Sequence, residues 1–551
     1  MKNPTLDKWV KEIQPSIAQR RAAMPDMQKA ANLYRGDFLG YMGLAQDEKG
    51  DRVWTNHVYS TIKAKVATLF WRNPHVLCQP RKGATIKTAR LVESIGNYLW
   101  SELKLKKRIK RVVQNALIFG TGWVKFAWDP ELPSGAWVRR YAPWRVHFDP
   151  TIEDFEDLTW LAFEMEETPE RIKDIYRQEI SGAAATVLRP TEGFDYARKK
   201  QLEFVSDEKL TEKTKLYEIH DREAQQVMLL CEGHDRWLKK PTKSAYTDLE
   251  QFFPALPLSL NIDVERIEGL SEALLLAPHE EALQRIRVFQ LRHLARANRK
   301  YETEEQNITI EGERALKSGE DGAIVTVKQI GKLRPIPDAS IPQDFYMVEP
   351  RVKEDIRNTS GMPDYRRGAG QLDPETASAV VAMERGADVI SVADRDEVEQ
   401  FCADLTRNLI QLYQMFSTRD RLAPIAERED IVGWREWGKR DIAGEYDFIT
   451  EIGSTIRKDE RQRKQEALEL YNGVKDDPNV NRVELLKYLF QTYRLPQTEN
   501  FLVAATPLPE EEGELGGPPM ELPEAMEGME DMEDMEDMRR FRQGVMTRAE
   551  F

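Results

Sequence analysis

The chain has 551 residues, of which 41% are hydrophobic and 32% are charged, and its formal net charge is −14 at pH 7. This length exceeds what one compact core holds, so we expect several domains or an elongated subunit of a globular protein. No apolar run approaches the length that spans a bilayer, so the composition argues against a membrane anchor or a membrane partner.

The acidic surplus is concentrated at the C-terminal end. Residues 506–551 contain 14 acidic and 4 basic residues, which leaves 80 acidic and 76 basic residues in the preceding chain. The tail therefore carries a net charge of −10 and the body only −4. Residues 528–538 repeat Met-Glu-Asp with a period of three, which suits neither helix nor strand, so we expect a disordered tail.

The N-terminal residues and the cysteines indicate the compartment. Residues 1–21 are polar and amphipathic and lack the apolar centre of a secretory signal, so we expect the protein to stay where it is made. Cys78, Cys231 and Cys402 are too few and too far apart for a disulfide framework. We expect them to be buried as small apolar residues.

The first 260 residues are predicted to form an α+β domain. Ten of the twelve tryptophans lie between Trp9 and Trp237, which places the large core in this half. Residues 55–74 read as a helix, and a longer helix with apolar positions from Leu91 to Ala116 ends near Gly120. Aromatic and β-branched segments bounded by turn residues predict strands, at residues 122–130, 137–150 and 215–233.

The second half is predicted to be mainly helical. Helices are expected over residues 268–300, with Pro278 as an interruption or the start of a second helix, and over about 350–358. Residues 322–337 between them resemble strand and turn. The longest helix is expected over residues 376–416, and residues 455–495 are expected to be helical after strand-like residues 433–450.

One apolar stripe marks the second half of that longest helix. Its positions step by four and three residues: Val398, Cys402, Leu405, Leu409, Leu412 and Phe416. We expect this face to be buried. The first half is rich in small residues and contains Gly386, which favours close helix contact or a bend there.

No motif for catalysis stands out. The chain lacks a phosphate-binding loop, since Gly331 and Lys332 are followed by Leu333, and it lacks H-E-x-x-H, G-x-S-x-G and C-x-x-C motifs. We therefore predict no catalytic residue, no resident metal and no cofactor.

Three clusters offer alternatives. Cys231, His234 and His220 supply three possible zinc ligands, but a strand-end cysteine and two surface histidines need no metal, and we favour that interpretation. The acidic run at residues 148–167 offers carboxylates for a magnesium-dependent nuclease, or a set of solvated faces and turns. The basic run at residues 104–111 suits a monomeric nucleic-acid-binding protein, or simply the solvated face of an amphipathic helix.

Several segments, in their order and spacing, resemble the portal protein of tailed bacteriophages. The matching segments are TNHVYSTIKAKVATLFWRNP, QNALIFGTGWVKFAWDP, PWRVHFDP, FPALPLSLN, IEGLSEALLLAPHEEALQRIR, NTSGM, TASAV and EIGSTIRKDERQRKQEALE. The likeness spans roughly residues 30–470. The methionine and acid repeat has no counterpart in that family, and residues 279–298 match its stem segment only loosely.

The resemblance implies a mainly helical α+β subunit with an α/β wing, a helical stem, a small β clip, a long tunnel helix and a helical crown. The implied parts are the wing (1–260), a stem helix (261–300), the clip (301–341), a second stem helix (342–358), the tunnel loop (359–375), the tunnel helix (376–416), the wing return (417–470), the crown (471–505) and the tail (506–551).

The implied tunnel loop accounts for an unusual sequence between two helices. Gly361, Gly368 and Gly370 would give backbone freedom to a loop that faces moving duplex DNA, and Arg366 and Arg367 would contact its phosphates. An ion pair of these arginines with Asp364, Asp373 or the next subunit is the alternative.

The resemblance also implies partners and a location. The subunit would form a ring, dodecameric in virions, that surrounds double-stranded DNA at the portal vertex of the capsid. It would contact major capsid and scaffolding proteins, the terminase large subunit and head-tail adaptor proteins, and it would assemble in the host cytoplasm.

Overall fold

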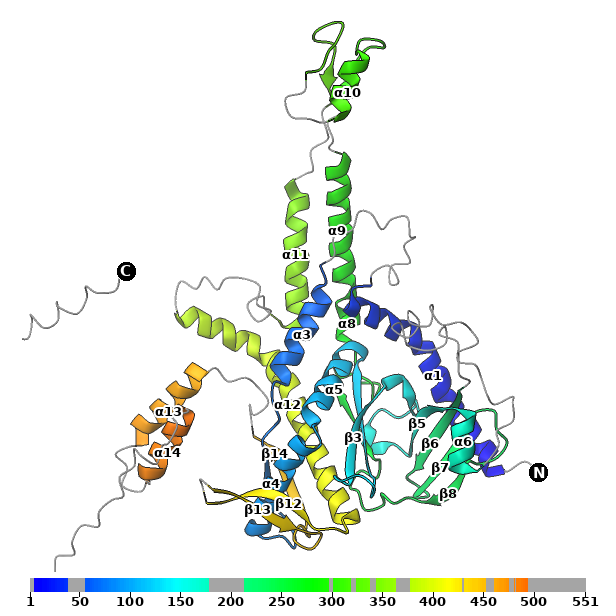
Figure 1. Ribbon diagram of the computed structural model, residues 1–551, viewed down its shortest axis with the longest axis vertical. Coiled ribbons are helices and arrows are strands. Elements are labelled where there is room, and N and C mark those ends of the chain that lie inside the picture. The colour runs from blue at the N-terminus through cyan, green and yellow to red at the C-terminus, as the bar shows by residue number, and fades with distance from the viewer. Residues whose placement is uncertain are drawn as a thin grey trace, which may run out of the picture. The chain divides into compact units, whose positions relative to one another are not determined.

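The computed structural model describes residues 4–37, 55–177, 213–296, 301–318, 324–336, 343–362, 377–428, 431–451, 460–474, 480 and 482–493. The chain divides into two compact units, Met1–Lys458 and Asp459–Phe551. The first unit combines helices with antiparallel sheets (Figure 1), as predicted for an α+β fold.

A five-stranded antiparallel sheet forms one part of the first unit. Its strands, in spatial order, are β4 (Val146–Phe148), β5 (Trp160–Glu167), β6 (Thr214–Asp221), β7 (Gln226–Cys231) and β8 (Lys239–Lys243). Successive side chains point to opposite faces. Tyr217 and Ile219 therefore pack on Trp9 and Ile13 of helix α1 (Pro4–Arg35), while Leu216 packs on the far side with helix α6 (Pro169–Tyr176).

A three-stranded sheet and four helices contribute most residues of the main core. The sheet order is β3 (Ala136–Tyr141), β2 (Thr121–Trp128) and β9 (Ala255–Ser259). The core helices are α3 (His57–Leu69), α4 (Ile86–Glu102), α5 (Leu105–Phe119) and α12 (Ala377–Phe416). Trp123 and Phe126 of the central strand are fully buried in this core.

Strands from distant parts of the chain meet at the edge of this core. β1 (Val76–Pro80) pairs antiparallel with β14 (Tyr446–Thr450), so that Cys78 lies opposite Phe448. A hairpin of β12 (Arg421–Arg428) and β13 (Ile431–Trp437) precedes β14. Residues that follow the longest helix thus return to the N-terminal part of the fold.

Helices α9 (Ala277–Arg296) and α11 (Gln343–Ser360) lie side by side and run in opposite directions (Figure 1). Between them in the chain come β10 (Tyr301–Glu302), helix α10 (Ile310–Ser318) and β11 (Arg334–Pro335). β10 pairs with β11, and Ile308 forms a single bridge with Val327. This connecting segment is therefore small and mixed, with very short strands.

The second unit contains helices α13 (Glu460–Val474) and α14 (Arg482–Thr492), which pack against each other. Ala467 is buried, and the Lys464 ammonium lies 5.4 Å from the centre of the Tyr493 ring. The helical prediction for residues 455–495 is confirmed over these described parts. None of the helices in the described ranges combines the length and apolar character that crossing a bilayer requires.

Most of the predicted elements agree with the structure. The strands expected at residues 122–130, 137–150, 215–233 and 433–450 are present, and the longest helix runs over Ala377–Phe416. Cys78, Cys231 and Cys402 are all buried and free, as expected.

The single long helix predicted from Leu91 to Ala116 is wrong. α4 ends at Glu102 and α5 begins at Leu105, with Lys104 in the left-handed conformation at a φ of 51°. Leu103 and Leu105 on either side of Lys104 are buried. The turn lets α4 pack on β1 and β12 while α5 packs on β2, which one straight helix does not allow.

Other boundaries also differ from the predictions. The first helix ends at Leu69 and not near Asn73, and residues 268–300 contain the short α8 (Glu272–Leu275) before α9. Pro278 is the second residue of α9, where it loses no hydrogen bond, which agrees with the alternative of a second helix. α10, which precedes the predicted strand and turn at residues 322–337, was not predicted, and α11 begins at Gln343, before Pro350.

Candidate functional site

The candidate site is the region where the two antiparallel helices meet the main core and where the chain passes into α12. Where the helix pair joins the core, the Arg287 guanidinium of α9 pairs with Glu349 of α11 at 3.2 Å, and Lys353 pairs with the same carboxylate at 2.8 Å. Arg287 also contacts the Thr55 hydroxyl, and Gln284 Nε2 donates to the Thr55 carbonyl at 3.2 Å. These contacts tie the helix pair to the segment that enters α3.

A buried carboxylate strengthens the same junction. Glu280 of α9 is fully buried and accepts a hydrogen bond from the His57 backbone N–H at 3.2 Å and from Gln284 Nε2 at 3.0 Å. The carboxylate therefore caps the N-terminus of α3 from another helix. Burial raises the pKa of Glu280 to about 7, although the hydrogen bonds and the Arg287 charge oppose the change.

The end of α11 is fixed in the core. Ile356, Ser360 and Met362 are buried, and the Ser360 hydroxyl accepts a hydrogen bond from the Met362 N–H at 3.3 Å. Gly361 has a φ of 62°, a left-handed conformation that ends helices and favours glycine. The predicted loop thus starts from an anchored point.

Only the first of the predicted loop glycines is described. Arg366, Arg367, Gly368 and Gly370 lie outside the described residues. Their assignment to a DNA-facing loop stays a prediction.

A buried charge cluster holds the middle of α12. Lys65 of α3 pairs with Glu272 of α8 at 3.0 Å and with Asp394 of α12 at 3.6 Å, and all three side chains are less than a tenth exposed. Burial is the main cause that raises the pKa of Asp394, and the Lys65 charge opposes it. Removing one member would leave an unpaired buried charge, so the cluster fixes the relative positions of the three helices.

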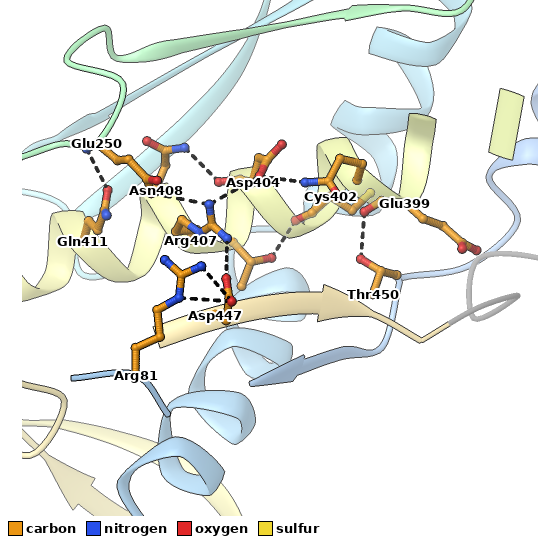
Figure 2. Close-up of polar contacts among 12 residues, drawn as sticks. Arg81, Glu250, Glu399, Cys402, Asp404, Arg407, Asn408, Gln411, Asp447 and Thr450 are labelled. Atoms are coloured by element: carbon orange, nitrogen blue, oxygen red, sulfur yellow. Dashed lines mark hydrogen bonds and ion pairs between the residues drawn. The ribbon is translucent and has the colours of Figure 1, made fainter. Parts of the chain in front are cut away.

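The second half of α12 is held by a polar network on one side (Figure 2). Arg407 pairs with Asp447 of β14 at 2.9 Å and with Glu250 at 3.4 Å, while Arg81 pairs with Asp447 at 2.8 Å. The Thr450 hydroxyl donates to the Glu399 carbonyl at 2.8 Å. These contacts hold β14 against α12.

The apolar stripe lies on the opposite side of α12. Its residues are buried as predicted, except for the last one. Val398, Cys402, Leu405, Leu409 and Leu412 are at most 1% exposed, whereas Phe416 is half-buried. Trp100 of α4 reaches the same helix and donates to the Thr406 hydroxyl at 2.9 Å.

The proposed zinc ligands do not come together. His220 lies opposite Val227 in the β6 and β7 ladder, whereas Cys231 lies opposite Leu216 at its other end. His220 instead contacts the Glu218 carboxylate, which Lys125 also approaches at 3.0 Å. Among the described residues, no group of three histidine, cysteine or acidic side chains is arranged to hold a metal ion.

The acidic run is likewise divided among separate cations. Glu164 lies near His147 and Lys215, Glu166 pairs with Arg145 at 2.7 Å, and Glu167 pairs with Arg171. These carboxylates are spaced along strand β5. The arrangement fits structural ion pairs better than a two-carboxylate metal site.

The basic run forms the start of α5. Leu105 and Ile109 are buried, while four lysines and an arginine are exposed: Lys104, Lys106, Lys107, Lys110 and Arg111. Arg108 contacts the Val138 carbonyl. The helix is amphipathic as expected, so its structure alone does not indicate a nucleic-acid partner.

Sequence reasoning missed the charged members of these networks. Lys65 occupies the buried face of α3 with Val58, Ile62 and Leu69, and Asp394 lies one helical turn before Val398 of the apolar stripe. A charge on an otherwise apolar stripe is the signal that predicts a buried partner.

A family model described as phage P22-like portal protein matches residues 26–546. The chain belongs to this family. The match confirms the resemblance to a portal protein, and it spans the main core, the antiparallel helices and α12. The P22-like portal proteins are structural components of the phage head. The chain therefore has a portal role at the capsid vertex, in a ring that is associated with the capsid and DNA. No curated protein matched the sequence.

Proposed function

We propose that this portal subunit forms the ring through which double-stranded DNA is packaged into the phage head and later ejected. The family match over residues 26–546 carries the proposal. The contacts that hold α9 and α11 on the core, and the contacts on both sides of α12, support it. Parts that surround a moving duplex must hold their position. The ring arises when one patch of each subunit binds a different patch of the next and the rotation closes, and we propose twelve copies in the virion.

The loop of residues 359–375 is proposed to face the DNA. The residues on either side of it are held in the core, Met362 at its start and Asp394 of α12 beyond its end. Arg366 and Arg367 would contact phosphates, and Gly361, Gly368 and Gly370 would let the loop follow the duplex.

The charge of the body suits a conduit. Duplex DNA carries about one negative charge per 1.7 Å of axis, so a wall dense in lysine and arginine would hold it through counterion release. A body with 80 acidic and 76 basic residues before residue 506 has no surplus of positive charge to do so. The DNA can then slide past with few strong contacts.

Residues 301–341, which connect α9 and α11, are proposed as the clip that docks first the terminase motor and then the head-completion and tail proteins. The small paired strands and α10 give this segment a fold of its own between two helices. The subunit is proposed to have no enzymatic activity, with the ATPase on the separate terminase chain.

Two experiments test this function. Negative-stain images of purified protein should show rings with a central opening, and solitary particles without one would contradict the proposal. Deleting residues 364–372 should leave ring formation intact and reduce DNA packaging or retention by about tenfold or more, because only the contacts to DNA are lost.

A deletion of the same size at residues 191–199 is the matched control, and it should leave both properties unchanged. If deletion of residues 364–372 prevents ring formation, the loop is structural and its assignment to the DNA is wrong.

A further inference from the structure

A recess with a volume of about 420 Å³ lies where the end of α1 meets α5, β3 and the short turn that follows β3. Three arginines line it, one each from α1, α5 and β3: Arg35, Arg111 and Arg140. None of the lining residues is acidic. The recess therefore presents mainly hydrogen-bond donors and positive charge.

Arg111 of α5 and Arg140 of β3 can still pair with a negatively charged group. The Arg140 guanidinium donates to Asn115 Oδ1 at 3.2 Å, and in the part of the chain that the structure describes neither Arg140 nor Arg111 pairs with a carboxylate. Asn115, which also lines the recess, is 6% exposed, and its Nδ2 has no acceptor among the described residues. A buried donor without an acceptor is costly, so the recess is incomplete as it stands.

The charges in the recess also repel one another. The pKa of Arg140 is lowered, chiefly by burial and also by the neighbouring Arg111 charge. A ligand with negative oxygens would satisfy both guanidinium groups and the Asn115 amide together.

The apolar wall limits what that ligand is. Phe119 and Trp144 line the recess and meet edge to face, with ring centres 5.4 Å apart. Such a wall suits a ligand with carbon atoms beside its oxyanion, such as an acidic side chain. Duplex DNA, in contrast, needs cations spaced along its backbone, whereas these two guanidinium groups line a single recess.

We propose that the recess receives a carboxylate side chain from a second copy of this chain. The inference rests on the proposed ring, in which each copy presents one patch to a different patch of its neighbour. Every copy offers such groups, because the chain has 94 acidic and 80 basic residues. The neighbour's aspartate or glutamate completes the site by pairing with Arg111 and Arg140 and by accepting from Asn115.

Charge reversal at Arg111 tests this proposal. Arg111→Glu should raise the protein concentration needed for half-maximal ring assembly by about tenfold or more, as measured by sedimentation velocity. Lys106→Glu makes the same charge change on the same helix outside the recess, and its assembly should stay within about twofold of the unaltered protein. Equal assembly of the two variants would overturn the proposal.

Photo-crosslinking identifies the occupant. A benzophenone amino acid in place of Gln114, which lines the recess, is placed in an equal mixture of ¹⁴N-labelled and ¹⁵N-labelled chains with duplex DNA present. Mixed-isotope crosslinks to a peptide with an acidic residue support the proposal. Crosslinks confined to one chain, or crosslinks to the DNA, overturn it.

The same experiments separate this inference from the proposed function. If unaltered protein forms no ring, the proposed function itself fails. If the unaltered protein and Arg111→Glu both form rings at the same concentration, the function stands and only the recess assignment fails. Matching thermal unfolding curves of the monomers exclude misfolding of the variant.

Discussion

At the scale of single residues, Glu280 carries the clearest pH dependence in the described chain. Its carboxyl group is buried where α9 meets α3, and burial raises its pKa from an ordinary value of 4.5 to about 7. The folded protein therefore keeps a proton that the unfolded chain has already released. The stability gained from this protonation is complete below pH 4.5 and is lost as the pH rises through 7.

Glu280→Gln should remove this dependence. The free energy of unfolding of the unaltered protein should fall by up to about 1.4 kcal/mol for each pH unit between pH 5 and 7, and the variant should lack that contribution. Denaturant unfolding of both proteins across this range measures the difference. Glu281→Gln, next to it on α9, is the control, and a Glu280→Gln variant with the same pH profile as the unaltered protein would show that Glu280 is ionised throughout.

At this scale the sequence predicted apolar burial better than polar pairing. The stripe from Val398 to Leu412 was predicted because its spacing alone determines which face is buried. The partners of Lys65 were not predicted, because Glu272 and Asp394 lie more than 200 residues further along the chain. Spacing within one helix does not contain that information.

At the scale of elements, the junction between α5 and β2 depends on how closely two loops approach. Gly120 has a φ of 88°, and a Cβ there would lie 1.9 Å from the Gly269 carbonyl oxygen. Gly269 belongs to the segment that leads into α8, so this contact fixes where the helix pair leaves the core. A side chain at Gly120 would push that segment away.

Gly120→Ala should therefore lower the free energy of unfolding by at least about 3 kcal/mol, from backbone strain together with the clash. Gly83→Ala is the matched control, since Gly83 has a φ of 77° and a Cβ added there would meet no atom within 4 Å. It should cost about 1 kcal/mol. Similar losses in the two variants, measured by denaturant unfolding, would contradict the role of the loop contact.

Element types were easier to predict than element boundaries. The period of the apolar residues predicts helix on both sides of Lys104, but the turn at Lys104 has no proline or glycine to mark it. It follows instead from packing, because α4 and α5 cover different sheets. α10 was missed for a different reason, because its nine residues are too few for a reliable period.

At the scale of the whole molecule, the uneven distribution of charge separates the body from the tail. The net charge of −14 comprises −10 in residues 506–551 and −4 in the preceding chain. A tail with this charge repels DNA at low salt, and the effect is screened over about 10 Å at 0.1 M salt. The tail lies outside the described residues.

Removing residues 506–551 should increase the affinity of assembled rings for duplex DNA by about two- to fivefold at low salt, and the gain should shrink at physiological salt. Fluorescence anisotropy with labelled duplex measures it. A tail of equal length with Asn and Gln in place of the acids should behave like the truncated chain. If the neutral tail binds DNA as weakly as the natural one, charge is not the cause.

The pairing of β1 with β14 has a consequence for how each new chain matures. β1 is complete by Pro80, but its partner begins at Tyr446, so ribosomes moving at about 5–20 residues per second leave it waiting for roughly 20 to 70 seconds. During that interval the edge of β1 that will pair with β14 is unpaired, and the surface that α12 will cover is exposed. The sheet of β1 and β14 therefore forms only near the end of translation, after α12 has been made.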